Sequence, residues 1–344
     1  MKQNFGLDLK FFSLFQMRKR NAPWVHYQQP SMPILIRQGK ITAPIMMRQR
    51  EKKRRKKSTL SILRKRLREE NAAKQIDILK IISAYYCQNV SEKTCDLNST
   101  NLCCLYDNFL DGSHGVSKLI LSRNRIGSLP EIFGNVQKDL EILEINDNKL
   151  ETFPQSVRHM KRLRDLVAQR NRIRSLPSEF SFLHNLVSLN LSENSLSSIA
   201  HLKGLKFLEK LILKKNKISS ISDRAVLASW ISLRHLDLDG NELTEIPSQI
   251  EALAKTLLVL NCSHNRIRTL PSNIGSMVYL KRLNLRFNSV ESLPIISISK
   301  CTNLSKFLLH GNETTLKEPP FDVCIRGIGY ALEWHNKNNP TIKV

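Results

Sequence analysis

The sequence predicts an α/β solenoid, and three observations lead to this fold class. An eleven-residue phrase, apolar-x-x-apolar-x-apolar-x-x-Asn-x-apolar, recurs through the chain, with clear copies at LVSLNLSENSL from Leu186 and LKRLNLRFNSV from Leu280. The asparagine that closes the phrase returns every 22 to 25 residues. Most phrases are followed by an apolar residue and a proline, which is typical of the start of a helical or 3-10 turn. Each unit therefore combines one short strand with a returning segment.

Alternation inside the phrase predicts which side chains enter the core. In LRHLDLDGNEL, Leu236 and Leu238 alternate with Asp237 and Asp239 at the period of two expected of a half-buried strand. We expect both leucines to point inward and both aspartates to lie outside. One unit cannot cover its own apolar row, so neighbouring units must stack, and stability becomes a sum of contacts between units.

The recurring asparagines are predicted to have a structural role. An asparagine side chain both donates and accepts hydrogen bonds, so a stacked ladder can satisfy main-chain groups that the turns after the strands would otherwise bury without partners. The predicted ladder consists of Asn124, Asn148, Asn171, Asn194, Asn216, Asn241, Asn265, Asn288 and Asn312.

Period and phrase together resemble the leucine-rich repeat over roughly two-thirds of the chain. The chain is similar to the intracellular Ras-associated and Scribble-like branch of that family. The resemblance implies a horseshoe with a parallel concave sheet, short convex helices or 3-10 turns, and helical caps at both ends. It also implies a non-enzymatic scaffold or adaptor that holds another protein on its concave face, with a role in intracellular signalling.

Two degenerate units end an array of about ten. In CDLNSTNLCCL, Thr100 takes the asparagine position 24 residues before Asn124, and the last unit, LSKFLLHGNET, departs from the pattern with Phe307 and Thr314. Terminal repeats are atypical because one side faces water or a cap. The predicted organisation is a basic, mostly disordered tail over 1–57, an amphipathic helix that caps the array over 58–87, the solenoid over 88–318, and a C-terminal cap helix with a tail over 319–344.

The returning segments are of two kinds. Six units carry a proline after an apolar residue, at Pro130, Pro154, Pro177, Pro247, Pro271 and Pro294. Two units lack it and have Ile199-Ala200 and Ile221-Ser222 in its place. We expect the curvature of the array to change beside these two units.

Positive charge is concentrated at the N-terminal end. The chain has a net charge of +24, and residues 1–80 hold 21 bases against 5 acids. The run Lys52, Lys53, Arg54, Arg55, Lys56 and Lys57 has four interpretations: a nuclear import signal that binds an importin, a nucleic-acid contact, a contact with an anionic membrane, or a solvated tail. A mitochondrial presequence over Met1–Arg20 is a weaker alternative, because Asp8 and the few arginines count against it. Ser58 and Thr59 are hypothetical phosphorylation sites beside the run.

Cysteine usage favours a reducing compartment. The seven cysteines exclude a fully paired framework. Their positions also differ from the clustered flanking cysteines of secreted members of the family. We therefore expect an intracellular protein of the cytoplasm or nucleus, with no transmembrane segment, which acts as a monomer.

No catalytic motif is found, and 12 glycines in 344 residues leave few flexible loops for one. His235, Asp237 and Asp239 on one strand, with His264 on the next unit, come nearest to a metal site, but alternating polar residues are ordinary on the solvent-exposed face of a strand. We expect no enzyme activity, no metal and no cofactor.

The concave face is the predicted binding surface, about 45 Å long for ten strands. Its candidate protein-binding residues are Lys210, Ile212, Lys214, His235, Asp237, Asp239, Asn261, Arg282, Asn284, Arg286 and Lys306. Two alternative functions stay open: a nuclear nucleic-acid-associated protein that binds through the basic segment, and a regulatory subunit of a phosphatase or a ubiquitin ligase. The identity of the partner does not follow from the sequence.

Overall fold

The computed structural model describes residues 60–88, 93–111 and 116–338. All of them belong to the compact unit Arg54–Val344. The predicted tail 1–57, with its basic run, and the candidate phosphorylation sites Ser58 and Thr59 lie outside the described residues.

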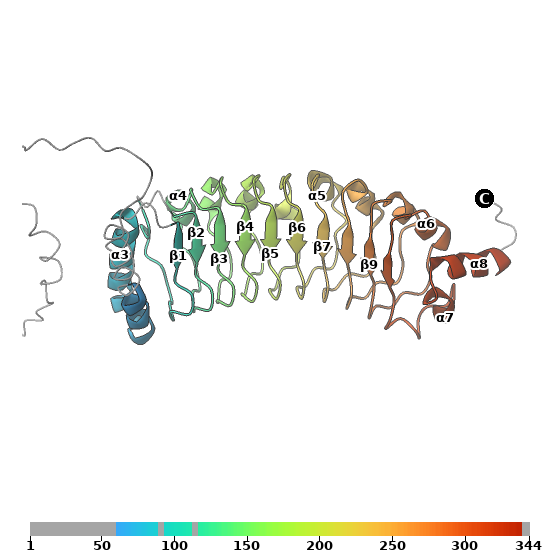
Figure 1. Cartoon of the computed structure of the whole chain (residues 1–344), viewed down its shortest axis with the longest axis horizontal. Coiled ribbons are helices and arrows are strands. Elements are labelled where there is room, and N and C mark those ends of the chain that lie inside the picture. Colours follow the sequence, from blue (N-terminus) through green and yellow to red (C-terminus); the bar gives the residue numbers. More distant parts are fainter. Residues whose placement is uncertain (1–59, 89–92, 112–115, 339–344) are drawn as a thin grey trace, which may run out of the picture. The chain divides into compact units, whose positions relative to one another are not determined.

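Ten parallel strands form a single curved sheet in chain order, β1 to β10 (Figure 1). The predicted solenoid is therefore confirmed. Each strand has three residues, and successive strands pair in register, so that the middle residue of one unit lies beside the middle residue of the next. The strands are β1 Thr94–Asp96, β2 Lys118–Ile120, β3 Ile142–Glu144, β4 Asp165–Val167, β5 Ser188–Asn190, β6 Lys210–Ile212, β7 His235–Asp237, β8 Val259–Asn261, β9 Arg282–Asn284 and β10 Lys306–Leu308.

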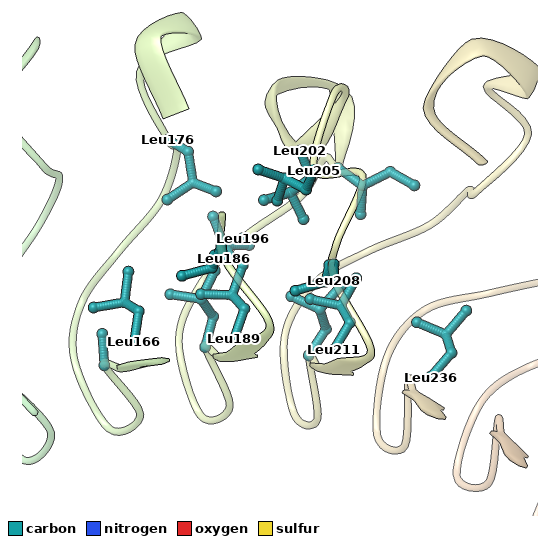
Figure 2. Packing of buried hydrophobic residues seen from close by; sticks show 14 of the residues in the cluster. Leu166, Leu176, Leu186, Leu189, Leu196, Leu202, Leu205, Leu208, Leu211 and Leu236 are labelled. Carbon is teal, nitrogen blue, oxygen red and sulfur yellow. The ribbon is translucent and has the colours of Figure 1, made fainter. Parts of the chain in front are cut away.

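Leucines in equivalent places form the core. The middle residue of each of the strands β2 to β9 is a buried leucine, flanked by two partly or fully exposed residues. Figure 2 shows Leu166, Leu189, Leu211 and Leu236 repeating from unit to unit inside the array. Because each leucine packs against its counterparts in the adjoining units, the core is continuous although no single unit encloses it.

The opposite side of the array carries short helical segments (Figure 1). They are α4 Phe133–Val136, η1 Gln155–His159, η2 Ser178–Phe182, η3 Ala200–Leu202, α5 Arg224–Ser229, η4 Ser248–Leu253, η5 Ser272–Ser276 and α6 Ile295–Ser299. Five of them begin directly after a proline, as predicted, because proline has no N–H to leave unpaired there. In α5 an aspartate replaces the proline: the Asp223 carboxylate accepts hydrogen bonds from the main-chain N–H of Ala225 and Val226.

The N-terminal cap consists of two helices, whereas the sequence analysis expected one. Residues 60–69 are helical, and α3 Ala72–Gln88 follows after a break. The break has a local cause: Asn71 Oδ1 accepts a hydrogen bond from the N–H of Lys74, and Gln75 Nε2 donates to the carbonyl of Leu67. The cap is joined to the first unit, where the Tyr86 hydroxyl donates to the carbonyl of Thr94 at 2.9 Å.

The C-terminal cap is also split, into α7 Phe321–Cys324 and α8 Ile328–Asn338. Between them Gly327 has a φ of +125°, a conformation that glycine adopts more readily than other residues. The expected single cap helix therefore ends one turn after the Pro319-Pro320 pair, and a second helix follows.

A left-handed backbone conformation recurs at the residue before each ladder position, and the sequence analysis did not predict it. The residues are Ser99, Arg123, Asp147, Arg170, Glu193, Lys215, Gly240, His264, Phe287 and Gly311, with φ between +50° and +84°. Eight of the ten are not glycine, although this conformation is unfavourable for residues with a Cβ. The ladder beside it holds each turn in place.

Candidate protein-binding face

The asparagine ladder fixes the position of every strand end. In the unit of β7, Asn241 Oδ1 accepts from the N–H of Ile218, and Asn241 Nδ2 donates to the carbonyls of Leu213 and Leu238, each at 3.0 Å. One side chain thus satisfies main-chain groups of its own turn and of the preceding unit. The other eight asparagines repeat this pattern, and in the first unit the Thr100 N–H donates to Asn124 Oδ1.

Strand register arranges the predicted binding residues in rows. Lys210, His235, Arg282 and Lys306 open their strands and lie in one row, and Ile212, Asp237, Asn261 and Asn284 close their strands and lie in the next. Lys214, Asp239 and Arg286 follow two residues after their strands. The residues at these positions on β1–β5 are called the N-terminal concave patch, and those on β6–β10 the C-terminal concave patch.

Asp239 does not lie outside, which corrects the sequence-based expectation. Its side chain is only 8% exposed. Adjoining units cover it: Lys214 Nζ lies 2.9 Å from one carboxylate oxygen, and Ser263 Oγ and His264 Nδ1 lie 2.6 and 2.8 Å from the other. Alternation within one strand does not reveal this burial, because the covering side chains come from the units before and after.

The buried charge of Asp239 is offset by the side chains of Lys214, Ser263 and His264. Burial raises the pKa of Asp239, but the hydrogen bonds from Ser263, Lys214 and His264 outweigh burial and hold the pKa below its ordinary value. The same hydrogen bond and charge pairing with Asp239 raise the pKa of Lys214. Asp239 and Lys214 are thus both ionised at neutral pH, and they link three units of the face.

The N-terminal concave patch contains one base, Lys118, against three acids, Asp96, Glu144 and Asp165. Lys118 Nζ lies 2.6 Å from a carboxylate oxygen of Glu144, and Asp96 pairs with Arg64 of the cap at 3.7 Å. Polar contacts continue across the patch, where Asn190 Nδ2 donates to Gln169 Oε1. Most of its charge is therefore neutralised by other residues of the chain.

The C-terminal concave patch contains five bases against two acids. Among the described residues, only Lys214 of the five forms an ion pair; the other four, Lys210, Arg282, Arg286 and Lys306, have no acidic partner. Arg286 Nε is buried and has no hydrogen-bond partner within the same part of the chain. Burial lowers the pKa of His235, and the nearby charges of Lys210 and Arg282 lower it further against the opposing effect of Asp237.

An exposed aromatic pair borders this patch, and the sequence analysis did not single it out. The rings of His264 and Phe287 stack at 4.6 Å between centroids, and Phe287 is 54% exposed. Both residues occupy the left-handed position of their turns. The sequence does contain one indication of this position. Gly240 and Gly311 occupy it in other units, and glycine often marks a residue with a left-handed backbone conformation.

Most of the thiols in the described residues are buried, and the candidate metal ligands do not form a metal site there. Cys95, Cys262, Cys301 and Cys324 are buried free thiols, and burial raises the pKa of Cys95 to about 12. No group of histidine, cysteine or acidic side chains in the described ranges is placed to hold a metal ion. In the same ranges, every helix is too short or too polar to cross a lipid bilayer.

Comparison with known proteins agrees with the architecture. Models described as leucine rich repeat match residues 114–173 and also 232–253 and 256–277. A solved leucine-rich repeat protein of Leptospira interrogans superposes with a TM-score of 0.60 at 28% identity, over 70% of this chain and 60% of that one.

Curated relatives include lumican of Gallus gallus, which is 30% identical over 262 residues, corresponding to 70% of this chain and 73% of lumican. The human leucine-rich repeats and immunoglobulin-like domains protein 3 is 29% identical over 176 residues, and the match spans 15% of that relative's length. Leucine-rich repeats generally serve as protein-binding scaffolds. The repeated phrase, the ten-stranded sheet and these matches together establish that the chain belongs to the leucine-rich repeat family.

Proposed function

We propose that this protein is a non-enzymatic scaffold whose C-terminal concave patch binds an acidic segment of a partner protein. The observation that carries the proposal is the set of four bases, Lys210, Arg282, Arg286 and Lys306, that have no acidic partner among the described residues. Like charges held on one surface repel each other, and an acidic ligand relieves that repulsion while it supplies hydrogen-bond acceptors.

Apolar surface beside the bases adds to the expected affinity. Val259 and Leu308 lie half-buried in the rows of Arg282 and Asn284, and the exposed ring of Phe287 borders them. Charges select the partner and speed its approach, whereas aromatic and aliphatic groups at the centre of an interface provide most of the binding free energy. The preferred ligand is therefore an acidic segment that also carries apolar side chains.

The test reverses two of the unpaired charges in the full chain. Arg282→Glu with Arg286→Glu should remove at least about tenfold of the partner affinity, since each change both loses a charge-assisted contact and adds a repulsive one. Partners are identified by proximity labelling in cells, and their affinity for the purified chain is then measured by calorimetry.

A matched control uses Arg266→Glu with Arg268→Glu, which changes the same charge on exposed arginines after β8, outside the strand rows. The control should retain the partner. Equal loss in both variants would assign binding to net charge, and unchanged binding in the Arg282 and Arg286 variant would assign it to another surface.

We further propose an intracellular location in the Ras-associated and Scribble-like branch of the family, with a role in signalling. Four buried free thiols, Cys95, Cys262, Cys301 and Cys324, support a reducing compartment. Microscopy of the tagged full chain tests the compartment, and replacement of Lys52–Lys57 by glutamine tests nuclear import. A secreted protein would contradict the location and leave the concave-face proposal unaffected.

A further inference from the structure

A hollow of about 340 Å³ lies at the N-terminal end of the array, away from the C-terminal concave patch. It is formed where the cap meets the turns after β1 and β2. Three of its six lining residues are arginines, and none is acidic: Arg68, Ser99, Asn101, Arg123, Asn124 and Arg125.

The cap side of the hollow is held by hydrogen bonds. Arg68 Nε donates to the carbonyl of Ser99 at 2.8 Å, which anchors one edge of the guanidinium group. Asn101 Nδ2 donates to the carbonyl of Arg68, and Gln75 Nε2 donates to the carbonyl of Asn101 at 3.1 Å. Because one guanidinium edge is used by the protein, the Nη groups of Arg68 remain for a ligand.

The array side presents two arginines on either side of a ladder asparagine. Asn124 is buried, and its amide is occupied by the main-chain groups of Thr100, Leu102, Leu97 and Leu121. Arg123 is held in the left-handed conformation, with a φ of +56°. Neither Arg123 nor Arg125 forms a side-chain hydrogen bond or an ion pair with any described residue.

Nearby carboxylates are engaged with other bases. Asp147, in the turn beside that of Arg123, pairs with Arg170 at 3.4 Å, and Glu70, close to Arg68 in the chain, pairs with Lys74 at 3.3 Å. Asp96 of the first unit pairs with Arg64. Three positive charges thus surround one hollow with no carboxylate in its lining.

We propose that this hollow is a binding site for a phosphate-bearing ligand. Guanidinium groups match phosphate oxygens with paired hydrogen bonds, and arginine cannot lose its charge at physiological pH. The volume is at the lower end of the range for small-ligand sites, which suits a phosphorylated ring or a headgroup. Ser99 and Asn101 add polar groups that a sugar or an inositol hydroxyl can use.

The same chemistry has two sources, a soluble phosphate ester and a phospholipid headgroup, and two probes distinguish them. Inositol 1,4,5-trisphosphate is titrated into the full chain by calorimetry. Phosphatidylcholine vesicles with and without phosphatidylinositol 4,5-bisphosphate are tested by sedimentation. Preference for the vesicles identifies a lipid source, and preference for the soluble probe identifies a free ligand.

The decisive variant is Arg68→Gln with Arg123→Gln, which should weaken binding of either probe at least about tenfold. Arg123→Lys should have a smaller effect, because it keeps the charge but loses paired hydrogen bonding. The matched control, Arg172→Gln with Arg174→Gln, removes two exposed bases after Asn171 that do not line the hollow, and it should bind as the wild type does.

Replacement of Lys52–Lys57 by glutamine, with the hollow intact, is the second control and should leave the affinity for inositol trisphosphate unchanged. Thermal unfolding of each variant verifies that it is folded. The proposal is overturned if neither probe binds, if the Arg172 and Arg174 control loses as much affinity as the Arg68 and Arg123 variant, or if binding disappears with the basic run.

Discussion

The concave face is formed by the outward side chains of the strands, and the asparagine ladder lies in the turns that follow the same strands. The two regions differ in how closely one unit resembles the next. Every ladder side chain from Asn124 to Asn312 accepts from a main-chain N–H of the preceding unit and donates to two carbonyls, one in that unit and one in its own turn. On the concave face the corresponding positions change from unit to unit: Glu144 pairs with Lys118, Asp239 is buried under its neighbours, and Arg286 has no acidic partner among the described residues.

This difference separates the residues that hold the fold from those available for function. The ladder satisfies buried polar groups, so a change there leaves a buried main-chain N–H without a partner and takes one hydrogen bond from each of two carbonyls. The concave face lies over a core that the leucines already complete, and its side chains can vary without opening the core. The effect of a substitution on stability should therefore decrease from the asparagine ladder to the buried Asp239, and then to the four bases of the C-terminal concave patch that have no acidic partner among the described residues.

The largest effect is expected at the ladder. Asn241→Ala leaves the Ile218 N–H without its partner and removes one of the two donors to each of the carbonyls of Leu213 and Leu238, which keep the amides of Asn216 and Asn265. The free energy of unfolding should fall by about 3 kcal/mol, since one buried N–H left unpaired costs about 1–3 kcal/mol and each of the two lost hydrogen bonds about 0.5–1.5 kcal/mol. Urea denaturation measures the loss.

Asn303→Ala is the comparison variant for the ladder. Asn303 is exposed and makes one hydrogen bond, to the carbonyl of Val278 at 2.7 Å. Its replacement should cost less than about 1 kcal/mol. A similar loss in the two variants would break the distinction between ladder asparagines and other asparagines.

An intermediate effect is expected at Asp239. Asp239→Asn removes the charge that Lys214 and His264 contact and should lower the free energy of unfolding by about 1–3 kcal/mol. The pKa of Asp239 is lowered in the folded state, so its contribution is present above the unfolded pKa of about 3.9 and is lost as the pH falls through the lower folded value.

The pH dependence of unfolding gives the measurement. The wild type should lose more stability than Asp239→Asn between about pH 5 and the folded pKa of Asp239, because only the wild type has this carboxylate to protonate. The two proteins should differ by a constant amount near neutral pH. Parallel curves through the acid range would show that Asp239 is not stabilised as a charge.

The smallest effect on stability is expected at the unpaired arginines of the C-terminal concave patch. Arg282→Gln with Arg286→Gln should change the free energy of unfolding by less than about 0.5 kcal/mol, since these side chains form no ion pair with any described residue. The same variant should weaken partner binding. Destabilisation by more than about 1 kcal/mol would place these arginines with the structural residues.

The sequence predicted the features that repeat and missed those that depend on neighbouring units. Leu236 and Asn241 follow from a phrase that is present in almost every unit. The burial of Asp239 arises from Lys214 and His264, which lie 25 residues away on either side in the chain. The break at Asn71 arises because its side chain accepts a hydrogen bond from the N–H of Lys74 and starts a new helix. The spacing of apolar residues in the cap does not predict this hydrogen bond.

The hollow at the N-terminal end was missed for a related reason. Arg68 and Arg123 belong to different elements, and only the docking of the cap on the first unit brings them to one place. The repeated phrase describes only what the units share, so it does not predict a site that forms between the cap and the first units.

The left-handed turns limit the order in which units can follow one another. A Cβ added to Gly311 would lie 2.5 Å from Cδ1 of Phe287, and one added to Gly240 would lie 3.1 Å from Cγ of Lys215. The unit that carries the large ring is therefore followed by one with no side chain at the same place. Moving or duplicating either of the last two units alone would break this pairing of the Phe287 ring with the space at Gly311, so a shortened or lengthened version of this protein should keep these two units together.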